Sequence, residues 1–130
     1  MKKNEAQLEL LFKALADRTR LRLLNLLAAG EVCVCFFVEV LGESQPKISR
    51  HLAYLRRAGV VAARREGKWM HYRVETPADP HTARVFVEVM TWLGEQREMQ
   101  KDRARLENIC CSPRLPVRLQ GAPRPTALSN

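Results

Sequence analysis

Residues 31–73 have the sequence EVCVCFFVEVLGESQPKISRHLAYLRRAGVVAARREGKWMHYR, which contains most of the structural signals in this chain. Ser44 can cap a helix that has Pro46 in its first turn. Two β-type runs follow, at 60–65 and Trp69–Val74, and a Glu-Gly-Lys segment joins them. The order of helix, turn, helix and hairpin predicts a winged helix-turn-helix. The inward-facing residues of the capped helix are Ile48, Leu52 and Leu55.

Three more helices are predicted before residue 44. Apolar residues at helical spacing place the first over residues 5–16. The second covers residues 18–29, with Asp17 as its N-cap and Gly30 as its stop. The third is short, holds Val34–Leu41, and begins in or just after a pair of cysteines.

A long final helix is predicted from Pro80 to about residue 106, roughly 40 Å at 1.5 Å per residue, with Asp79 as its cap. Its first half is apolar on almost every face, and one chain of this size cannot cover all of those faces. We therefore expect a homodimer whose interface is formed by this helix and the first one. The predicted fold is mainly α with a small β-hairpin, a homodimeric winged helix-turn-helix of order α-α-α-α-β-β-α.

The length of 130 residues allows one domain, which we place at residues 1–109. Residues 110–130 are rich in proline and arginine and are expected to be a disordered tail. The longest uncharged apolar run, residues 32–38, is far too short to span a bilayer, and no leader peptide is visible. A cytoplasmic protein without a membrane partner is expected. Nothing in the sequence is typical of an enzyme site or a nucleotide-binding loop.

The net charge of +8 is concentrated in one part of the chain. Residues 44–73 hold eight basic residues and one acid, a local charge of +7, whereas residues 84–107 hold five of each. Such a concentration is typical of a protein that binds a polyanion, here double-stranded DNA. The alternative is a solvated basic helix or one that packs on an acidic partner.

The capped helix carries the side chains that we expect to contact DNA. Gln45 can pair with adenine and Arg50 with guanine, while neighbouring side chains and the hairpin tip can contact phosphates. In a dimer, two such helices about 34 Å apart would bind an inverted repeat. Histidines in this region are as easily explained as core or edge residues. The predicted DNA-binding residues are Ser44, Gln45, Lys47, Ser49, Arg50, His51, Tyr54, Arg64, Arg65 and Lys68.

The four cysteines form two close pairs, Cys33/Cys35 and Cys110/Cys111, and the expected location favours free thiols or metal ligands over disulfides. In a regular helix, residues two apart differ by about 200° in direction. Cys33 and Cys35 can therefore share one ion only if this segment precedes the helix or unwinds on binding. The alternatives are two small buried apolar residues for the first pair and incidental cysteines at a fraying helix end for the second.

Four segments together resemble the ArsR/SmtB family of metalloregulatory repressors, and within it the arsenic-responsive branch. They are E-x-C-V-C at 31–35, S-Q-P-K-I-S-R-H-L at 44–52, R-x-A-G-V-V at 56–61 and E-G-K-W-x-H-Y at 66–72. The resemblance covers roughly residues 5–108. It implies a repressor that binds its operator when free of inducer and leaves DNA when trivalent arsenic binds cysteine thiolates.

The arsenic-responsive relatives typically continue as C-V-C-x-x-C, but the third position here is Val38. Cys110 or Cys111 could supply a third thiolate to arsenite, or a methylarsenite with only two bonds to sulfur could use the first pair alone. Trivalent antimony is a further candidate inducer, and no resident cofactor is required. The alternatives are a cadmium, lead or zinc sensor with four thiolates, and a repressor switched by thiol oxidation.

Overall fold

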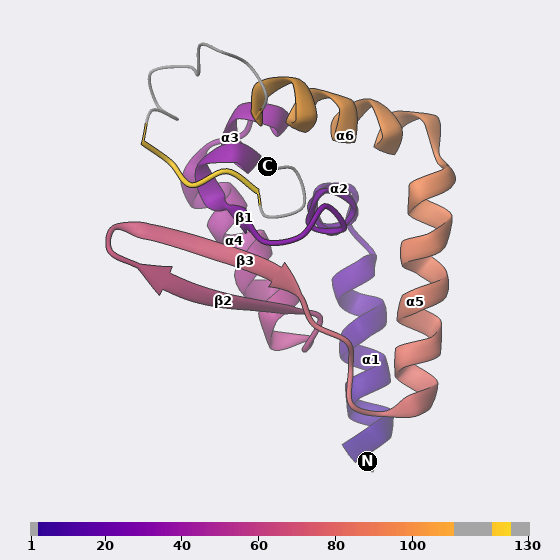
Figure 1. Ribbon diagram of the computed structural model, residues 1–130. Helices are drawn as coiled ribbons and strands as arrows, with labels where there is room; N and C mark the ends of the chain where they lie inside the picture. Colours follow the sequence, from indigo (N-terminus) through magenta and orange to yellow (C-terminus); the bar gives the residue numbers. More distant parts are fainter. Residues whose placement is uncertain (1–2, 111–120, 126–130) are drawn as a thin grey trace.

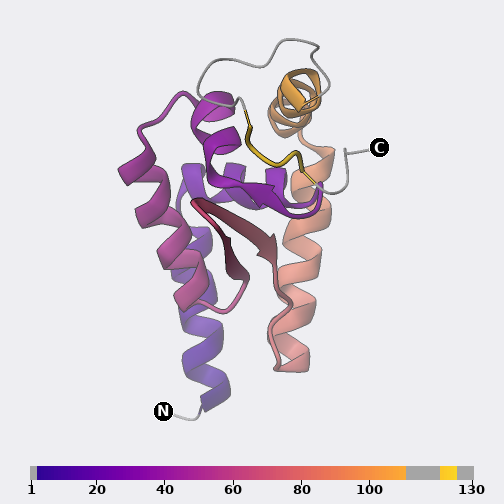
Figure 2. The same cartoon turned by 60° about the vertical axis from the view of Figure 1, so that its left-hand side comes forward.

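The computed structural model describes residues 3–110 and 121–125 and is shown in Figure 1. The β2–β3 hairpin extends from the helical body on the side away from α5. In the second view, α4 and α5 stand on opposite sides of the hairpin (Figure 2). The elements are α1 (Lys3–Leu15), α2 (Arg18–Leu27), β1 (Val32–Cys33), α3 (Val34–Leu41), α4 (Gln45–Arg57), β2 (Val61–Glu66), β3 (Trp69–Val74), α5 (Pro80–Glu95) and α6 (Arg97–Cys110).

Three predicted helix starts are confirmed, and each depends on a side chain at the N-cap position. The capping oxygen accepts a hydrogen bond from the backbone N–H three residues further along the chain. This bond satisfies one of the donors that every helix start leaves without an intrahelical partner. The helix-turn-helix is thus marked by local signals, because α3 also ends at Gly42, whose φ of 68° lies in the left-handed region. The capping residues are Asp17, Ser44 and Asp79.

The predicted hairpin is confirmed, but the sheet has a third strand that was not predicted. The strand order is β1-β3-β2, and both pairings are antiparallel. In the register, Cys33 is opposite His71, and His71 is opposite Arg64. β1 is only two residues long, too short for any alternation of polar and apolar residues to reveal it. The thiol pair is therefore joined to the hairpin by backbone pairing.

The prediction of one long C-terminal helix is wrong, because the helix is broken at Gln96. That residue has extended backbone angles, φ −80° and ψ 132°. After it, α6 crosses over α2 and α3 (Figure 1). The Asp102 carboxylate accepts hydrogen bonds of 2.8 and 2.9 Å from the Arg22 guanidinium, and Asn25 donates one of 2.8 Å to the Met99 carbonyl. These long-range bonds favour the turned position of α6.

A single core joins the helices and the base of the sheet, and it includes Leu24, Phe36, Phe37 and Leu52, all fully buried. No helix in the described ranges is long and apolar enough to cross a membrane. The predicted tail lies mostly outside the described residues. Of its described part, residues 121–125, the side chain of Ala122 is buried against the core.

Candidate functional site

The two sulfurs of Cys33 and Cys35 lie 3.2 Å apart. Cys33 has extended backbone angles and is the N-cap residue of α3, whereas Cys35 lies in the first turn of the helix. The first of the two predicted conditions is met by Cys33 alone, which precedes the helix, and this brings the two sulfurs together without unwinding α3. That the pair binds one ion stays a prediction.

The environment of the pair favours one thiolate. The Cys35 thiol donates a hydrogen bond to the Cys33 sulfur, which lowers the pKa of Cys33 to about 7. The backbone N–H groups of Cys35 and Val34 also lower it, and burial opposes them. The same hydrogen bond, with burial, raises the pKa of Cys35. Near neutral pH the pair thus holds a nucleophilic sulfur and a shared proton.

Burial differs between the two sulfurs as well. Cys33 is fully buried in the core, whereas Cys35 is half-buried. Cys110, at the end of α6, is also buried. Within the described ranges no group of three His, Cys, Asp or Glu side chains is arranged to hold a metal ion. Cys111 lies outside the described residues, so a third thiolate from the C-terminal pair stays a prediction.

The first turns of α4 present the polar face that was predicted to enter a DNA groove. Gln45 and Arg50 are exposed, and neither side chain has a hydrogen bond or ion pair with another described residue. Ser49 is half-buried, and Ser44 is occupied as the helix cap. Lys47 makes an ion pair of 3.1 Å with Glu43 one turn before it. The two side chains proposed to read bases are therefore free to do so.

Two of the residues predicted to contact DNA, His51 and Tyr54, also contact the Arg20 side chain on α2. The guanidinium of Arg20 lies 4.2 Å from the centre of the Tyr54 ring, and one of its nitrogens is 3.4 Å from His51 Nδ1. The same guanidinium donates hydrogen bonds to the carbonyls of Ala14 and Lys13, at 2.8 and 3.1 Å. Arg20 thus ties the end of α1 to the middle of α4. The sequence analysis missed it, because its partners on α4 are more than thirty residues away.

The wing cations also divide into two kinds. Arg65 and Lys68 are exposed at the tip of the hairpin, as predicted. Arg64 is held in ion pairs with Glu31, at 2.6 Å, and with Glu66, at 2.8 Å. Most of the N–H donors of Arg64 already have carboxylate partners, which leaves few for the predicted contact with a phosphate.

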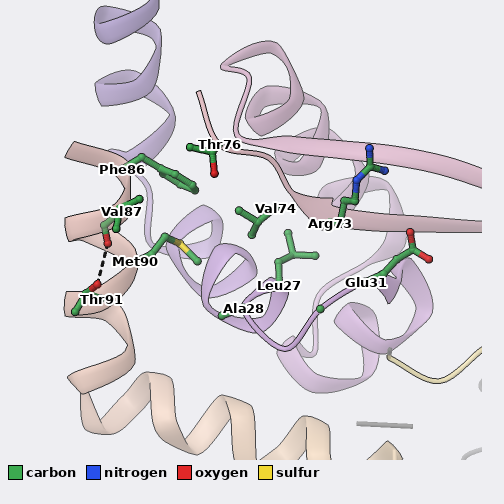
Figure 3. A pocket seen from close by; sticks show the side chains of 11 residues that line it. Leu27, Ala28, Glu31, Arg73, Val74, Thr76, Phe86, Val87, Met90 and Thr91 are labelled. Carbon is green, nitrogen blue, oxygen red and sulfur yellow. Dashed lines mark hydrogen bonds between the residues drawn. The ribbon is translucent and has the colours of Figure 1, made fainter. Parts of the chain in front are cut away.

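An apolar pocket of about 660 Å³ lies between α2, the end of β3 and α5 (Figure 3). Its wall on α5 includes Val87, which is exposed, and the end away from α5 has the two charged side chains Glu31 and Arg73. No pattern in the sequence predicted this pocket. Its other apolar lining residues include Leu27, Val74, Phe86 and Met90.

Comparisons with known proteins agree with this arrangement. The sequence profile described as "Bacterial regulatory protein, arsR family" matches residues 17–63. The arsenical resistance operon repressor of Escherichia coli K12 is 45% identical over 103 residues, which cover 78% of this chain and 86% of that protein.

Two solved structures show the same fold. HlyU from Vibrio cholerae N16961 has a TM-score of 0.57 and 32% identity, and the match covers 70% of this chain and 99% of HlyU. The AntR antimony-specific transcriptional repressor has a TM-score of 0.55 and 33% identity, covering 72% of this chain and 84% of AntR. The helix-turn-helix with its wing, the thiol pair and these relatives lead to one conclusion. The chain belongs to the ArsR family of bacterial transcriptional regulators, which are DNA-binding proteins and not enzymes.

Proposed function

We propose that this protein is a cytoplasmic repressor that binds operator DNA as a homodimer and leaves it when a trivalent metalloid binds Cys33 and Cys35. The observation that carries the proposal is the 3.2 Å separation of the two sulfurs at the start of the helix-turn-helix. Relatives described as an arsenical resistance operon repressor and as an antimony-specific repressor support the class of inducer.

The spacing of the sulfurs favours trivalent arsenic or antimony over a tetrahedral metal ion. Metal–sulfur bonds of about 2.3 Å at a tetrahedral centre place two sulfurs roughly 3.8 Å apart. A pyramidal trivalent centre has narrower bond angles and brings its sulfurs closer together, as Cys33 and Cys35 already are. Methylarsenite has two bonds available for sulfur, and Cys33 and Cys35 can fill both of them. Arsenite would take its third thiolate from Cys110 or Cys111.

Release from DNA would follow from the burial of Cys33. Protein interiors are close-packed, so a heavy atom added to the sulfur of the fully buried Cys33 is expected to displace neighbouring atoms. Either β1 or α3 must move to make room. Because α3 packs against α4, such a movement changes the position of the helix that carries Gln45 and Arg50 relative to the DNA grooves.

Operator release measured for single cysteine variants tests this proposal. The compounds are arsenite, methylarsenite, antimonite and cadmium, and the readout is operator affinity by fluorescence anisotropy. Methylarsenite should release wild type but neither Cys33→Ser nor Cys35→Ser, and both variants should still bind DNA. Cys110→Ser and Cys111→Ser should respond normally to methylarsenite, and the one that supplies the third ligand should lose its arsenite response. Wild type that stays on DNA with every metalloid, or responds to cadmium alone, would disprove the proposal.

The pKa of Cys33 adds a pH dependence. Because the thiolate is the attacking nucleophile, the rate of methylarsenite capture should rise as the pH increases through about 7, where Cys33 loses its proton. One arsenic-bound hydroxyl then leaves as water with the Cys35 proton, and the other leaves as hydroxide that takes a proton from solvent. Ultraviolet thiolate absorption should show the same midpoint, and Cys33→Ser should lack it. A wild-type thiolate transition near the ordinary cysteine pKa would contradict the assignment.

The dimer of this proposal uses α1 and α5, which pack against each other. Three large apolar side chains on these helices, Phe12, Val87 and Trp92, each expose 53% of their surface. The pocket beside Val87 extends the apolar area (Figure 3). A second copy of the chain would cover it. Val87→Glu should shift the protein from dimer to monomer in sedimentation experiments, whereas Lys101→Glu on α6 should not.

A further inference from the structure

The thiol pair and the wing are joined by a row of side chains across the three-stranded sheet. Residues directly opposite each other on neighbouring strands project to the same face of a sheet. Because Cys33 is opposite His71 and His71 is opposite Arg64, all three side chains lie on one face. The row begins at the buried sulfur and ends in β2, the outer strand of the wing.

At the β2 end of this row, two nitrogens of Arg64 form an ion pair with the Glu31 carboxylate. Arg64 Nε lies 2.9 Å from each Glu31 oxygen, and a terminal nitrogen lies 2.6 Å from one of them. The other terminal nitrogen donates to Glu66 at 2.8 Å. Glu31 precedes Cys33 by two residues, so this pair fixes the thiol-bearing segment to the wing.

His71 lies between the sulfur and the ion pairs. Its side chain is 5% exposed, and its ring nitrogens lie 3.8 Å from Glu31 and 3.8 Å from Glu66. Nε2 has no hydrogen-bond partner among the described residues. The buried His71 ring thus occupies the middle of the row, between Cys33 and Arg64.

We propose that Arg64 is a positioning residue that couples the metalloid site to the wing through Glu31. This inference rests on the proposed function. When inducer moves the Cys33 segment, Glu31 moves with it, and Arg64 transmits the movement to the hairpin that carries Arg65 and Lys68. The role of Arg64 is then to aim the wing, and the phosphate contacts are left to the two exposed cations.

The test compares operator affinity with and without methylarsenite for wild type, Arg64→Gln, Glu31→Gln and Arg65→Gln. Wild type should lose about 100-fold in affinity with methylarsenite, within the usual range of allosteric coupling. Arg64→Gln and Glu31→Gln should still bind methylarsenite one to one, measured by loss of free thiols, but should lose only about 10-fold or less. Arg65→Gln should weaken DNA binding equally in both states and keep the wild-type ratio.

A double variant that exchanges the two charges of the ion pair shows whether Arg64 couples the metalloid site to the wing or only stabilises the fold. Glu31→Arg combined with Arg64→Glu should recover more of the wild-type ratio than either single change, because the ion pair is restored in reverse. Full coupling in both Gln variants would overturn the proposal, as would an Arg64→Gln variant that behaves like Arg65→Gln. If wild type binds methylarsenite but does not leave DNA, the proposed function itself fails, and the coupling role fails with it.

Discussion

The cations at the start of α4 and the tip of the wing differ from those on α2 and along β2 in what they contact. Arg50, Arg65 and Lys68 are exposed and have no carboxylate partner among the described residues. Arg22 and Arg64 are bound to carboxylates that lie 80 and 33 residues away in the sequence. The first set is available to DNA, and the second holds elements of the protein in position.

This difference changes the meaning of the local charge. The value of +7 over residues 44–73 treats every basic residue as a possible DNA contact. Glu31 lies outside that stretch, yet it neutralises Arg64. A cation's partner, and not its place in a basic segment, decides whether it attracts DNA or supports the fold. The following predictions test this division.

The largest effect is expected at the buried pair of Arg22 and Asp102. Asp102→Ala leaves the Arg22 charge without its partner, and should lower the free energy of unfolding by about 3 kcal/mol. The Arg22 side chain that remains is 24% exposed, so water replaces the lost interaction only in part. Urea denaturation measures the change, with the exposed Glu107→Ala on the same helix as control. A loss no greater than that of the control would show that α6 is held by other contacts.

The next largest effect concerns Arg50. If its exposed guanidinium reads a base, Arg50→Ala should weaken operator binding by about 2 kcal/mol and relax the preference at one base pair. Stability should be unchanged, since the side chain has no partner among the described residues. Competition binding with single-base operator variants measures both quantities. An equal loss for operator and random DNA would assign Arg50 to a phosphate instead.

Arg20 should behave in the opposite way. Arg20→Ala removes the contact with the Tyr54 ring and two hydrogen bonds to the end of α1, which should cost about 1.5 kcal/mol of stability. Arg57→Ala is the matched control, because Arg57 lies 5.5 Å from the same ring centre. Thermal unfolding distinguishes the two variants. Equal stability would mean that Arg20 does not hold α4.

The smallest effect distinguishes two cations of the wing. Lys68→Ala should reduce the slope of log affinity against log salt by about 1, because one phosphate contact is lost. Arg64→Ala should leave that slope unchanged, since its partners are carboxylates of the protein. A reduced slope for Arg64→Ala would show that Arg64 contacts a DNA phosphate, and the wing would then not contain two kinds of cation.

Local signals predicted the helix-turn-helix and the hairpin, whereas long-range contacts determined what the sequence did not show. The caps Asp17, Ser44 and Asp79 bond to residues three positions away, so their role is visible in the sequence. The break at Gln96 depends on Asp102 meeting Arg22, and no local pattern contains that contact. Likewise, the sequence left open whether the cysteine segment precedes α3 or must unwind to bring the sulfurs together. The residue at which α3 begins decides this, because it determines where the two sulfurs point.

The complete burial of Cys33 has a consequence for which reagents the protein can detect. The more nucleophilic sulfur is inside the core, while the half-buried Cys35 is the one that a solute meets first. We therefore expect a compound that binds both sulfurs to meet Cys35 first and to reach Cys33 only if it is small. Bulky electrophiles should react with Cys35 alone, so that size as well as affinity for sulfur would decide which compounds bind the pair.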